Sequence, residues 1–306
     1  MKAIKISVSL FEYLTQYETI LGRIHSVFDG AFNVVDENNH LIGILSTKKE
    51  LGPLSMQVNK DTFNMLGLEQ GQLIKFTDDC LHFDKSKFKI IYKDCPIESL
   101  SLNPMDVQVN STLNLKLNLL KSLILEHGSQ AGIAPLIDHL SFENEPSYDS
   151  EGRTLNEYSD FIQERLLGLL EDLNQGIGQE AFKSLEKIIG FGPGLTPSAD
   201  DFISGILSVL MVNGQLDDGL KAYILKLINN KTTRISEEML HHTLNGEVSE
   251  SYKYFIEALF DDKNKDISNE SKDVIQIGST SGTDYLFGVY CMASLITIKE
   301  ASNDQI

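Results

Sequence analysis

Basic residues are scarce in this chain. Its 306 residues include 26 Lys and Arg against 44 Asp and Glu, which gives a formal net charge of −18 at pH 7. A surface this acidic repels phosphate backbones and anionic headgroups, so we expect neither a nucleic acid nor a membrane surface as a partner. A small anionic ligand is compatible with this charge only where local hydrogen-bond donors outweigh the overall field.

Long hydrophobic runs and paired cysteines are also missing. The apolar stretches at residues 202–212 and 286–298 are shorter than the roughly 18 to 20 residues that span a bilayer. The first residues contain neither a long apolar run nor a small-residue cleavage site, which indicates a first strand rather than a signal peptide. Cys80, Cys95 and Cys291 lack C-x-x-C spacing, which argues against a disulfide framework or a zinc ribbon. We therefore expect reduced thiols in a cytoplasmic protein.

The first third of the chain has the pattern of β-strands. Short runs rich in Val, Ile and Phe alternate with turn residues. These runs cover residues 2–9, 23–35, 40–46, 54–58, 72–76 and 88–92. Five or six short strands at this spacing predict a small barrel or sandwich that ends near Pro104, so the first domain is expected to span residues 1–105.

The rest of the chain has helical periodicity. Leu113, Leu117, Leu120 and Ile124 recur at steps of three and four, as one buried helix face requires. Similar runs follow at residues 155–173, 182–189, 201–212, 220–228, 236–244, 252–260 and 285–298. The polar stretch 142–153 is expected to form a loop, and the charged stretch 261–272 a connector. The fold class is therefore α+β, with a mainly helical domain over residues 106–306.

The densest motif is residues 190–201 (GFGPGLTPSADD), followed directly by an apolar helix. Three glycines and two prolines within eight residues impose an irregular loop. Either Thr196 caps the helix, with Pro197 at its first position, or Ser198 caps it and Asp201 completes a capping box. Both alternatives leave free backbone amides and the positive end of the helix dipole facing a ligand, which suits a phosphate or a carboxylate. The motif is not a P-loop, since no G-K-[ST] follows it.

A second motif, residues 277–288 (IGSTSGTDYLFG), repeats the spacing of the first. A hydroxyl residue, an acid and a glycine recur at steps of three and seven. They are Ser198, Asp201 and Gly205 in the first copy, and Ser281, Asp284 and Gly288 in the second. We expect the glycines to let two helices cross closely, so that both helix starts open onto one anion-binding pocket. Ordinary helix capping is the alternative explanation, above all for the second copy.

The candidate anion-binding residues come from these two motifs and from the segment at residues 232–236. They are Gly190, Gly192, Gly194, Leu195, Thr196, Ser198, Asp200, Asp201, Arg234, Ser236, Gly278, Thr280, Ser281, Gly282 and Asp284. Three of these residues, Asp200, Asp201 and Asp284, could alternatively bind Mg²⁺ through oxygen atoms, or simply complement the helix dipoles. No other cofactor is expected.

Two further features of the sequence have competing explanations. The guanidinium group of Arg234 suits a carboxylate or a phosphate, but a surface ion pair with Glu237 or Glu238 would equally explain it. Ser236 is a plausible cap for the helix that follows. His25 and Ser26 resemble a nucleophilic pair, but neighbours on a strand point to opposite faces, which disfavours that interpretation. The catalytic residues are therefore unknown from the sequence.

Four segments of the chain resemble the AllH-like family of bacterial proteins, and they span roughly residues 22–288. The segments are GRIHSVF with AFNVV, GFGPGLTPSADDF, TTRISEEML with NGEVSE, and IGSTSGTDYLFG. Two positions depart from the family pattern: Ala199 stands where S-G-D-D has glycine, and Ser279 stands where a histidine often precedes T-S-G.

This resemblance implies a function in carbamoyl transfer. One family member is a subunit of oxamate carbamoyltransferase, an enzyme of anaerobic allantoin breakdown that exchanges a carbamoyl group between oxamate and phosphate. The resemblance implies carbamoyl phosphate, oxamate or phosphate as the ligand, and partner protein subunits. The alternatives are a non-catalytic metabolite-binding or scaffold subunit, and a magnesium-dependent enzyme that acts on a phosphorylated metabolite.

Overall fold

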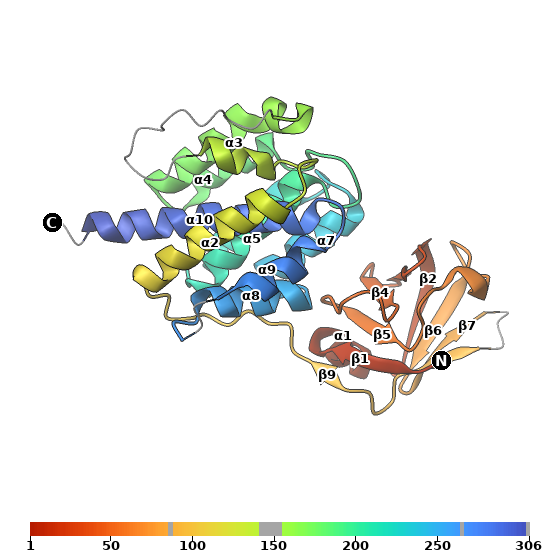
Figure 1. The fold of residues 1–306 in the computed structure, drawn as a ribbon. Helices are drawn as coiled ribbons and strands as arrows, with labels where there is room; N and C mark the ends of the chain where they lie inside the picture. The colour runs from red at the N-terminus through yellow and green to blue at the C-terminus, as the bar shows by residue number, and fades with distance from the viewer. Residues whose placement is uncertain (85–87, 141–154, 264–265, 304–306) are drawn as a thin grey trace. The chain divides into compact units, whose positions relative to one another are not determined.

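The computed structural model describes residues 1–84, 88–140, 155–263 and 266–303. The described chain divides into two compact units, Met1–Ser101 with Glu247–Glu250, and Leu102–Gly246 with Ser251–Ile306. The first unit holds the strands and the second is helical, which confirms the predicted α+β class (Figure 1). The loop predicted at residues 142–153 lies outside the described residues.

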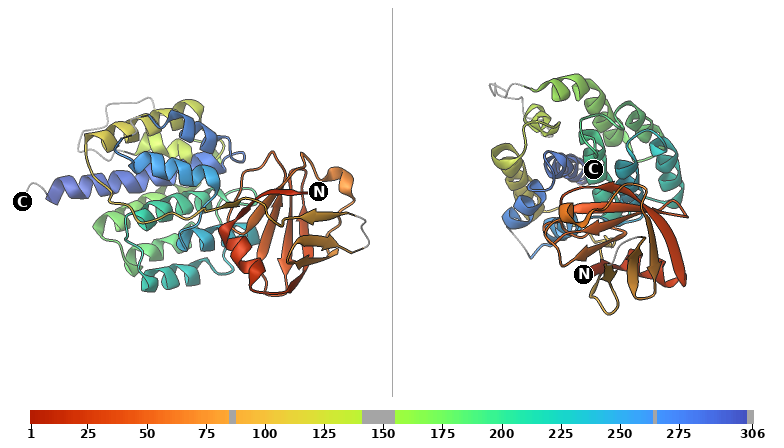
Figure 2. Two further views of the ribbon diagram at one scale, coloured as in Figure 1. Left: turned by 90° about the horizontal axis from the view of Figure 1, so that it is seen from below. Right: turned by 90° about the vertical axis from the view of Figure 1, so that its right-hand side faces the viewer.

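The first unit is one curled, half-barrel sheet with the strand order β8-β7-β6-β2-β3-β4-β5-β1-β9 (Figure 2). Most neighbours pair antiparallel, whereas β4 with β5 and β1 with β9 pair parallel. The strands are β1 (Ala3–Ser7), β2 (Thr19–Val27), β3 (Ala31–Asp36), β4 (Leu41–Leu45), β5 (Ser55–Val58), β6 (Leu73–Thr77), β7 (Cys80–Phe83), β8 (Lys89–Ile91) and β9 (Ile97–Glu98).

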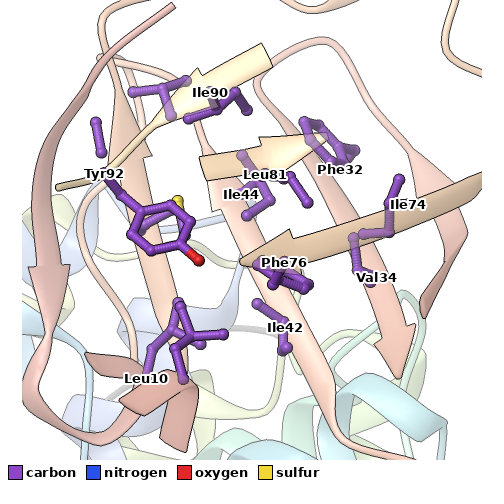
Figure 3. Close-up of a cluster of buried hydrophobic side chains, with 14 of the residues drawn as sticks. Leu10, Phe32, Val34, Ile42, Ile44, Ile74, Phe76, Leu81, Ile90 and Tyr92 are labelled. Atoms are coloured by element: carbon purple, nitrogen blue, oxygen red, sulfur yellow. The ribbon is translucent and has the colours of Figure 1, made fainter. Parts of the chain in front are cut away.

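One side of this sheet forms the core of the unit. Alternate residues of β3 and β4, such as Phe32 and Ile44, are completely buried, as a strand with one covered face requires (Figure 3). Leu10 of helix α1 (Val8–Thr15) belongs to the same cluster. The sequence predicted one strand over residues 2–9, and this is wrong beyond Ser7. The Ser7 hydroxyl accepts a hydrogen bond from the backbone amide of Leu10 at 3.2 Å and so starts α1.

The second unit is built around two of its own long helices, α5 and α10. Every residue of α5 is buried, and Figure 1 shows α10 beside it. The helices are α2 (Ser111–His127), α3 (Glu157–Gln175), α4 (Gln179–Phe182), α5 (Ser198–Val212), α6 (Asp218–Ile228), α7 (Arg234–Leu244), α8 (Glu250–Phe260), α9 (Ser268–Ile275) and α10 (Ser281–Asn303).

Most of the predicted helical runs are confirmed, with two corrections. The run at 182–189 is α4 followed by a 3-10 turn, and the expected connector at 261–272 contains the start of α9. No helix among the described residues is long and apolar enough to cross a membrane.

A buried lysine closes the end of α8. The Nζ atom of Lys116, on α2, donates to the backbone oxygens of Ala258 at 2.8 Å, Leu259 at 3.0 Å and Asp261 at 2.7 Å. The last carbonyl groups of a helix have no partner within the helix, so this ammonium group satisfies atoms that would otherwise be buried unpaired. Lys116 therefore has a structural role.

Candidate functional site

The two motifs meet through their glycines, as the sequence predicted. A Cβ atom added to Gly205 of α5 would overlap the backbone oxygen of Tyr285 and lie 2.8 Å from the backbone nitrogen of Val289. A Cβ atom added to Gly288 of α10 would overlap the backbone oxygen of Phe202 in the same way. Each glycine thus lets the backbone of the other helix approach to contact.

The starts of the two helices are joined by side-chain hydroxyl groups. The Oγ1 atom of Thr196 lies 2.9 Å from the Oγ atom of Ser281, and the Oγ atom of Ser198 lies 3.4 Å from the Oγ1 atom of Thr280. The paired helix starts expected from the repeated spacing are therefore present in the structure.

The predicted capping of α5 is wrong in both of its versions. Pro197 occupies the N-cap position and makes no side-chain cap hydrogen bond, and Ser198 is the first residue of the helix. The hydroxyl groups of Thr196 and Ser198 contact the hydroxyl groups of Ser281 and Thr280 at the start of α10. Because Ser198 is not the cap, Asp201 does not complete a capping box.

The glycine-rich loop has the irregular backbone that its composition predicts. The φ angles of Gly190, Gly192 and Gly194 are 75°, 120° and 98°, a region that side-chain-bearing residues rarely adopt. No described residue accepts a hydrogen bond from the backbone amides of Gly192, Gly194 or Leu195. Gly194 and Leu195 are exposed, so the tip of the loop presents unpaired donors to solvent. By contrast, the amide of Ala199, in the first turn of α5, is taken by the backbone oxygen of Phe191 at 3.0 Å.

Asp200 attaches this loop to the start of α7. Its carboxylate accepts hydrogen bonds from the backbone amide of Gly190 at 2.7 Å, from the Ser236 hydroxyl at 2.6 Å and from the Thr232 hydroxyl. Burial raises the pKa of Asp200, and these three hydrogen bonds oppose the rise. Thr233, and not Ser236 as expected, caps α7, and its hydroxyl also donates to the backbone oxygen of Leu195. Asp200 thus holds the glycine-rich loop at Gly190 and the start of α7 at Ser236 through hydrogen bonds.

Asp201 and Asp284 form a buried pair beneath the joined helix starts. Their exposed fractions are 1% and 0%. Burial raises the pKa of Asp284 from 3.8 to about 6. Burial also raises the pKa of Asp201 well above its ordinary range, and the charge of Asp284 adds to this effect. The nearby hydroxyl groups of Ser281 and Thr196 lower the pKa of Asp201 but do not offset burial, so the pair favours keeping a proton.

The carboxyl groups of this pair are only partly satisfied. One oxygen of Asp284 accepts from the backbone amides of Ile133 at 2.8 Å and Ala134 at 3.0 Å. Its other oxygen and both oxygens of Asp201 are buried without a partner in hydrogen-bond geometry. A Cβ atom on Gly132 would lie 2.7 Å from the Cγ atom of Asp284, so a glycine is needed at that position. Sequence reasoning missed this turn, because nothing in the sequence connects it to a residue 150 positions away.

The remaining candidates lie around these groups. Gly278, with a φ of 65°, and Gly282 shape the turn from α9 into α10. Arg234 forms an ion pair with Glu238, which confirms the alternative offered by the sequence. A role for Arg234 in ligand binding stays a prediction.

An aromatic stack borders the glycine-rich loop. The rings of Phe161 and Phe191 are stacked with centroids 5.4 Å apart, and the guanidinium group of Arg165 lies 4.9 Å from the centroid of the Phe161 ring. Phe161 is 60% exposed. The loop therefore has an apolar rim on one side, which the sequence did not reveal.

The alternative that Asp200, Asp201 and Asp284 bind Mg²⁺ finds little support in the arrangement of these side chains. Within residues 1–84, 88–140, 155–263 and 266–303, no group of three or more His, Cys, Asp or Glu side chains is placed to hold a metal ion. Asp200 uses both of its oxygens in hydrogen bonds. Magnesium binding by Asp201 and Asp284 stays a prediction.

These features define an α+β protein. It has a curled sheet and a helical unit in which α5 and α10 cross closely at two glycines. Residues 188–293, which run from the glycine-rich loop into α10, match the family described as oxamate carbamoyltransferase subunit AllH. Residues 2–97, which cover the sheet, match the AllH family N-terminal domain. The chain therefore belongs to the AllH family. No solved structure matches it.

Proposed function

We propose that this chain is a subunit of a carbamoyltransferase complex and binds a small phosphate- or carboxylate-bearing metabolite at the paired starts of α5 and α10. The observation that carries the proposal is the set of unpaired amides in the glycine-rich loop beside the hydroxyl groups that join the two helices. Family membership supports the carbamoyl-transfer context, with oxamate, carbamoyl phosphate or phosphate as the ligand.

The local donors can overcome the acidity of the whole chain. The amides of Gly192 and Gly194, the hydroxyl groups of Thr196 and Ser281, and two positive helix ends would act on one anion. Arg234 would add a positive charge at the edge. The buried acids below need not repel the ligand, because a protonated carboxyl group is neutral.

The proposed contribution to catalysis is binding and charge stabilisation. Carbamoyl transfer needs the two reactants aligned and the charge that develops on oxygen stabilised, and fixed amide and hydroxyl donors supply both. We assign no nucleophile to this chain. Residues of partner subunits would complete the reaction.

Thermal unfolding of the purified chain with inorganic phosphate, carbamoyl phosphate or oxamate tests this proposal. We expect at least one of the three to raise the melting temperature. Thr196→Val and Ser281→Ala should reduce the rise, because each removes a hydroxyl donor. The exposed Ser122→Ala on α2 is the matched control and should behave as the wild type. The absence of a shift with all three anions would overturn the anion site.

A turnover assay with partner subunits separates the alternatives. Carbamoyl transfer that requires this chain and falls in Thr196→Val supports the catalytic subunit. Stabilisation by the anions without any contribution to turnover would favour a metabolite-binding or scaffold subunit. Anion binding that appears only after Mg²⁺ is added would favour the magnesium-dependent enzyme.

A further inference from the structure

A β-bulge in β2 brings together two side chains that strand geometry would separate. Ile24 pairs with Val34 of β3, but the next pair is Ser26 with Asn33, so His25 is the extra residue. The Nδ1 atom of His25 lies 3.2 Å from the Oγ atom of Ser26. The expectation that these side chains point to opposite faces is therefore wrong.

Asn33 completes a group of three polar side chains, named here the bulge triad (His25, Ser26 and Asn33). The Nδ2 atom of Asn33 donates to the Oγ atom of Ser26 at 3.1 Å. The Ser26 oxygen accepts from Asn33, and its own proton can be donated to the Nδ1 atom of His25. In the tautomer that accepts this proton at Nδ1, the other ring nitrogen, Nε2, carries the imidazole proton. The hydrogen bonds fix the orientation of both the amide and the ring.

The bulge triad lies on the face of the sheet opposite the core. Phe32 and Val34, on either side of Asn33, are fully buried, whereas Asn33 is half-buried. The residue across from Asn33 on β4 is Gly43, which has no side chain to cover it. Even a Cβ atom added to Gly43 would stay 3.9 Å from the Oδ1 atom of Asn33.

Several hydrogen-bonding groups of the bulge triad are unused. No described residue bonds to the Oδ1 atom of Asn33 or to the Nε2 atom of His25, and the second N–H of the Asn33 amide also has no partner. Asn33 thus offers one acceptor and one donor side by side. In the tautomer with the proton on Nε2, the His25 ring offers a further donor. This set differs from the unpaired backbone amides of the glycine-rich loop, which are donors alone.

We propose that the bulge triad binds a primary carboxamide group. A carboxamide carries an N–H donor beside a carbonyl acceptor, so it can pair with the Asn33 amide through two hydrogen bonds. In that tautomer the Nε2 atom of His25 would donate a hydrogen bond to a carboxylate placed next to that carboxamide. Oxamate has both groups, and its choice as the ligand rests on the proposed function.

Calorimetric titration of the intact protein with oxamate and with oxalate tests this site. Oxalate has a carboxylate in place of the carboxamide, so we expect the wild type to bind oxamate more tightly. Asn33→Asp keeps the size of the side chain but replaces the N–H donor with an acceptor. It should weaken oxamate binding at least about tenfold, as the loss of one good hydrogen bond predicts. Ser26→Ala should weaken it less, because the orientation of Asn33 and His25 is lost but their own hydrogen-bonding groups remain.

A control variant separates loss of this site from a general effect of the added charge. Gln16→Glu makes the same amide-to-acid change at an exposed site of the sheet unit and should bind oxamate as the wild type does. If Asn33→Asp fails to fold, judged by circular dichroism, Asn33→Ser replaces it. No oxamate binding by the wild type, or an unchanged preference for oxamate over oxalate in the Asn33 variant, would overturn the inference.

Inorganic phosphate distinguishes this site from the helical one. Phosphate has no carboxamide, so its binding should not change in the Asn33 variant. No phosphate binding by the wild type, together with Asn33-dependent oxamate binding, would refute the anion site at the helix starts and support the bulge triad. A fall in phosphate binding in the Asn33 variant would contradict the carboxamide specificity of the bulge triad.

Discussion

The crossing of α5 and α10 makes Gly288→Ala the most informative single substitution in the helical unit. The added Cβ atom would lie 2.9 Å from the backbone carbon of Phe202 and closer still to its oxygen. The clash is with the backbone of a fully buried helix, which cannot rotate away as a side chain can. The two helices would have to move apart, and overpacking of this kind costs about 1–3 kcal/mol.

Gly168→Ala is the matched control for this substitution. Gly168 lies within α3, and a Cβ atom there would meet nothing within 4 Å. The same chemical change should therefore stabilise the protein by about 0.5–1 kcal/mol, because alanine loses less backbone entropy in a helix. The two substitutions are expected to shift the free energy of unfolding in opposite directions.

Urea unfolding followed by far-ultraviolet circular dichroism measures both effects. We expect the midpoint to fall for Gly288→Ala and to rise slightly for Gly168→Ala, with similar slopes. Equal shifts in the two variants, or a Gly288→Ala protein as stable as the wild type, would refute the close crossing.

Three other predictions concern buried charged groups, and urea unfolding tests each of them. The pKa of Asp284 in the folded protein, about 6, lies above its ordinary 3.8, so ionisation opposes folding. The stability of the wild type relative to Asp284→Asn should be highest below pH 4 and fall by about 3 kcal/mol as the pH rises past 6; a difference independent of pH would contradict this. Asp200→Ala should cost about 3 kcal/mol because three donors lose their acceptor, the buried Ser236 hydroxyl among them, and an unchanged midpoint would show that the loop does not depend on it. Lys116→Met should cost about 2–3 kcal/mol because it leaves carbonyl groups at the end of α8 unpaired, whereas a neutral effect would mean that water replaces the ammonium group.

The periodicity of apolar residues was sufficient to predict the class of fold. Alternation in the first third and steps of three and four afterwards reflect which side chains must leave water, and both units show these patterns. The elements missed include α1, α9 and the short strands β7 and β9. Such short elements depend on neighbours in the sheet or on one cap, such as Ser7, more than on their own pattern.

The site could be predicted in part, because spacing along a helix is a geometric quantity. Glycines seven residues beyond the two serines lie at matching positions of their helices, so a close crossing could be expected, and the structure shows it. The roles of the hydroxyl groups could not be inferred in the same way. A serine at a helix start can bond to its own first turn or to a neighbouring helix, and only the position of that neighbour decides.

The sequence by itself determined the acidic charge, the two kinds of secondary structure and the matching spacing of the two motifs, since each depends on composition or on local spacing. Tertiary structure alone decided that Asp201 and Asp284 are buried together, that a distant turn at Ile133 supplies amides to one of them, and that a bulge joins His25 to Ser26. Each of these facts depends on contacts between segments far apart in the chain or on a register shift between strands, and neither leaves a periodic signal in the sequence.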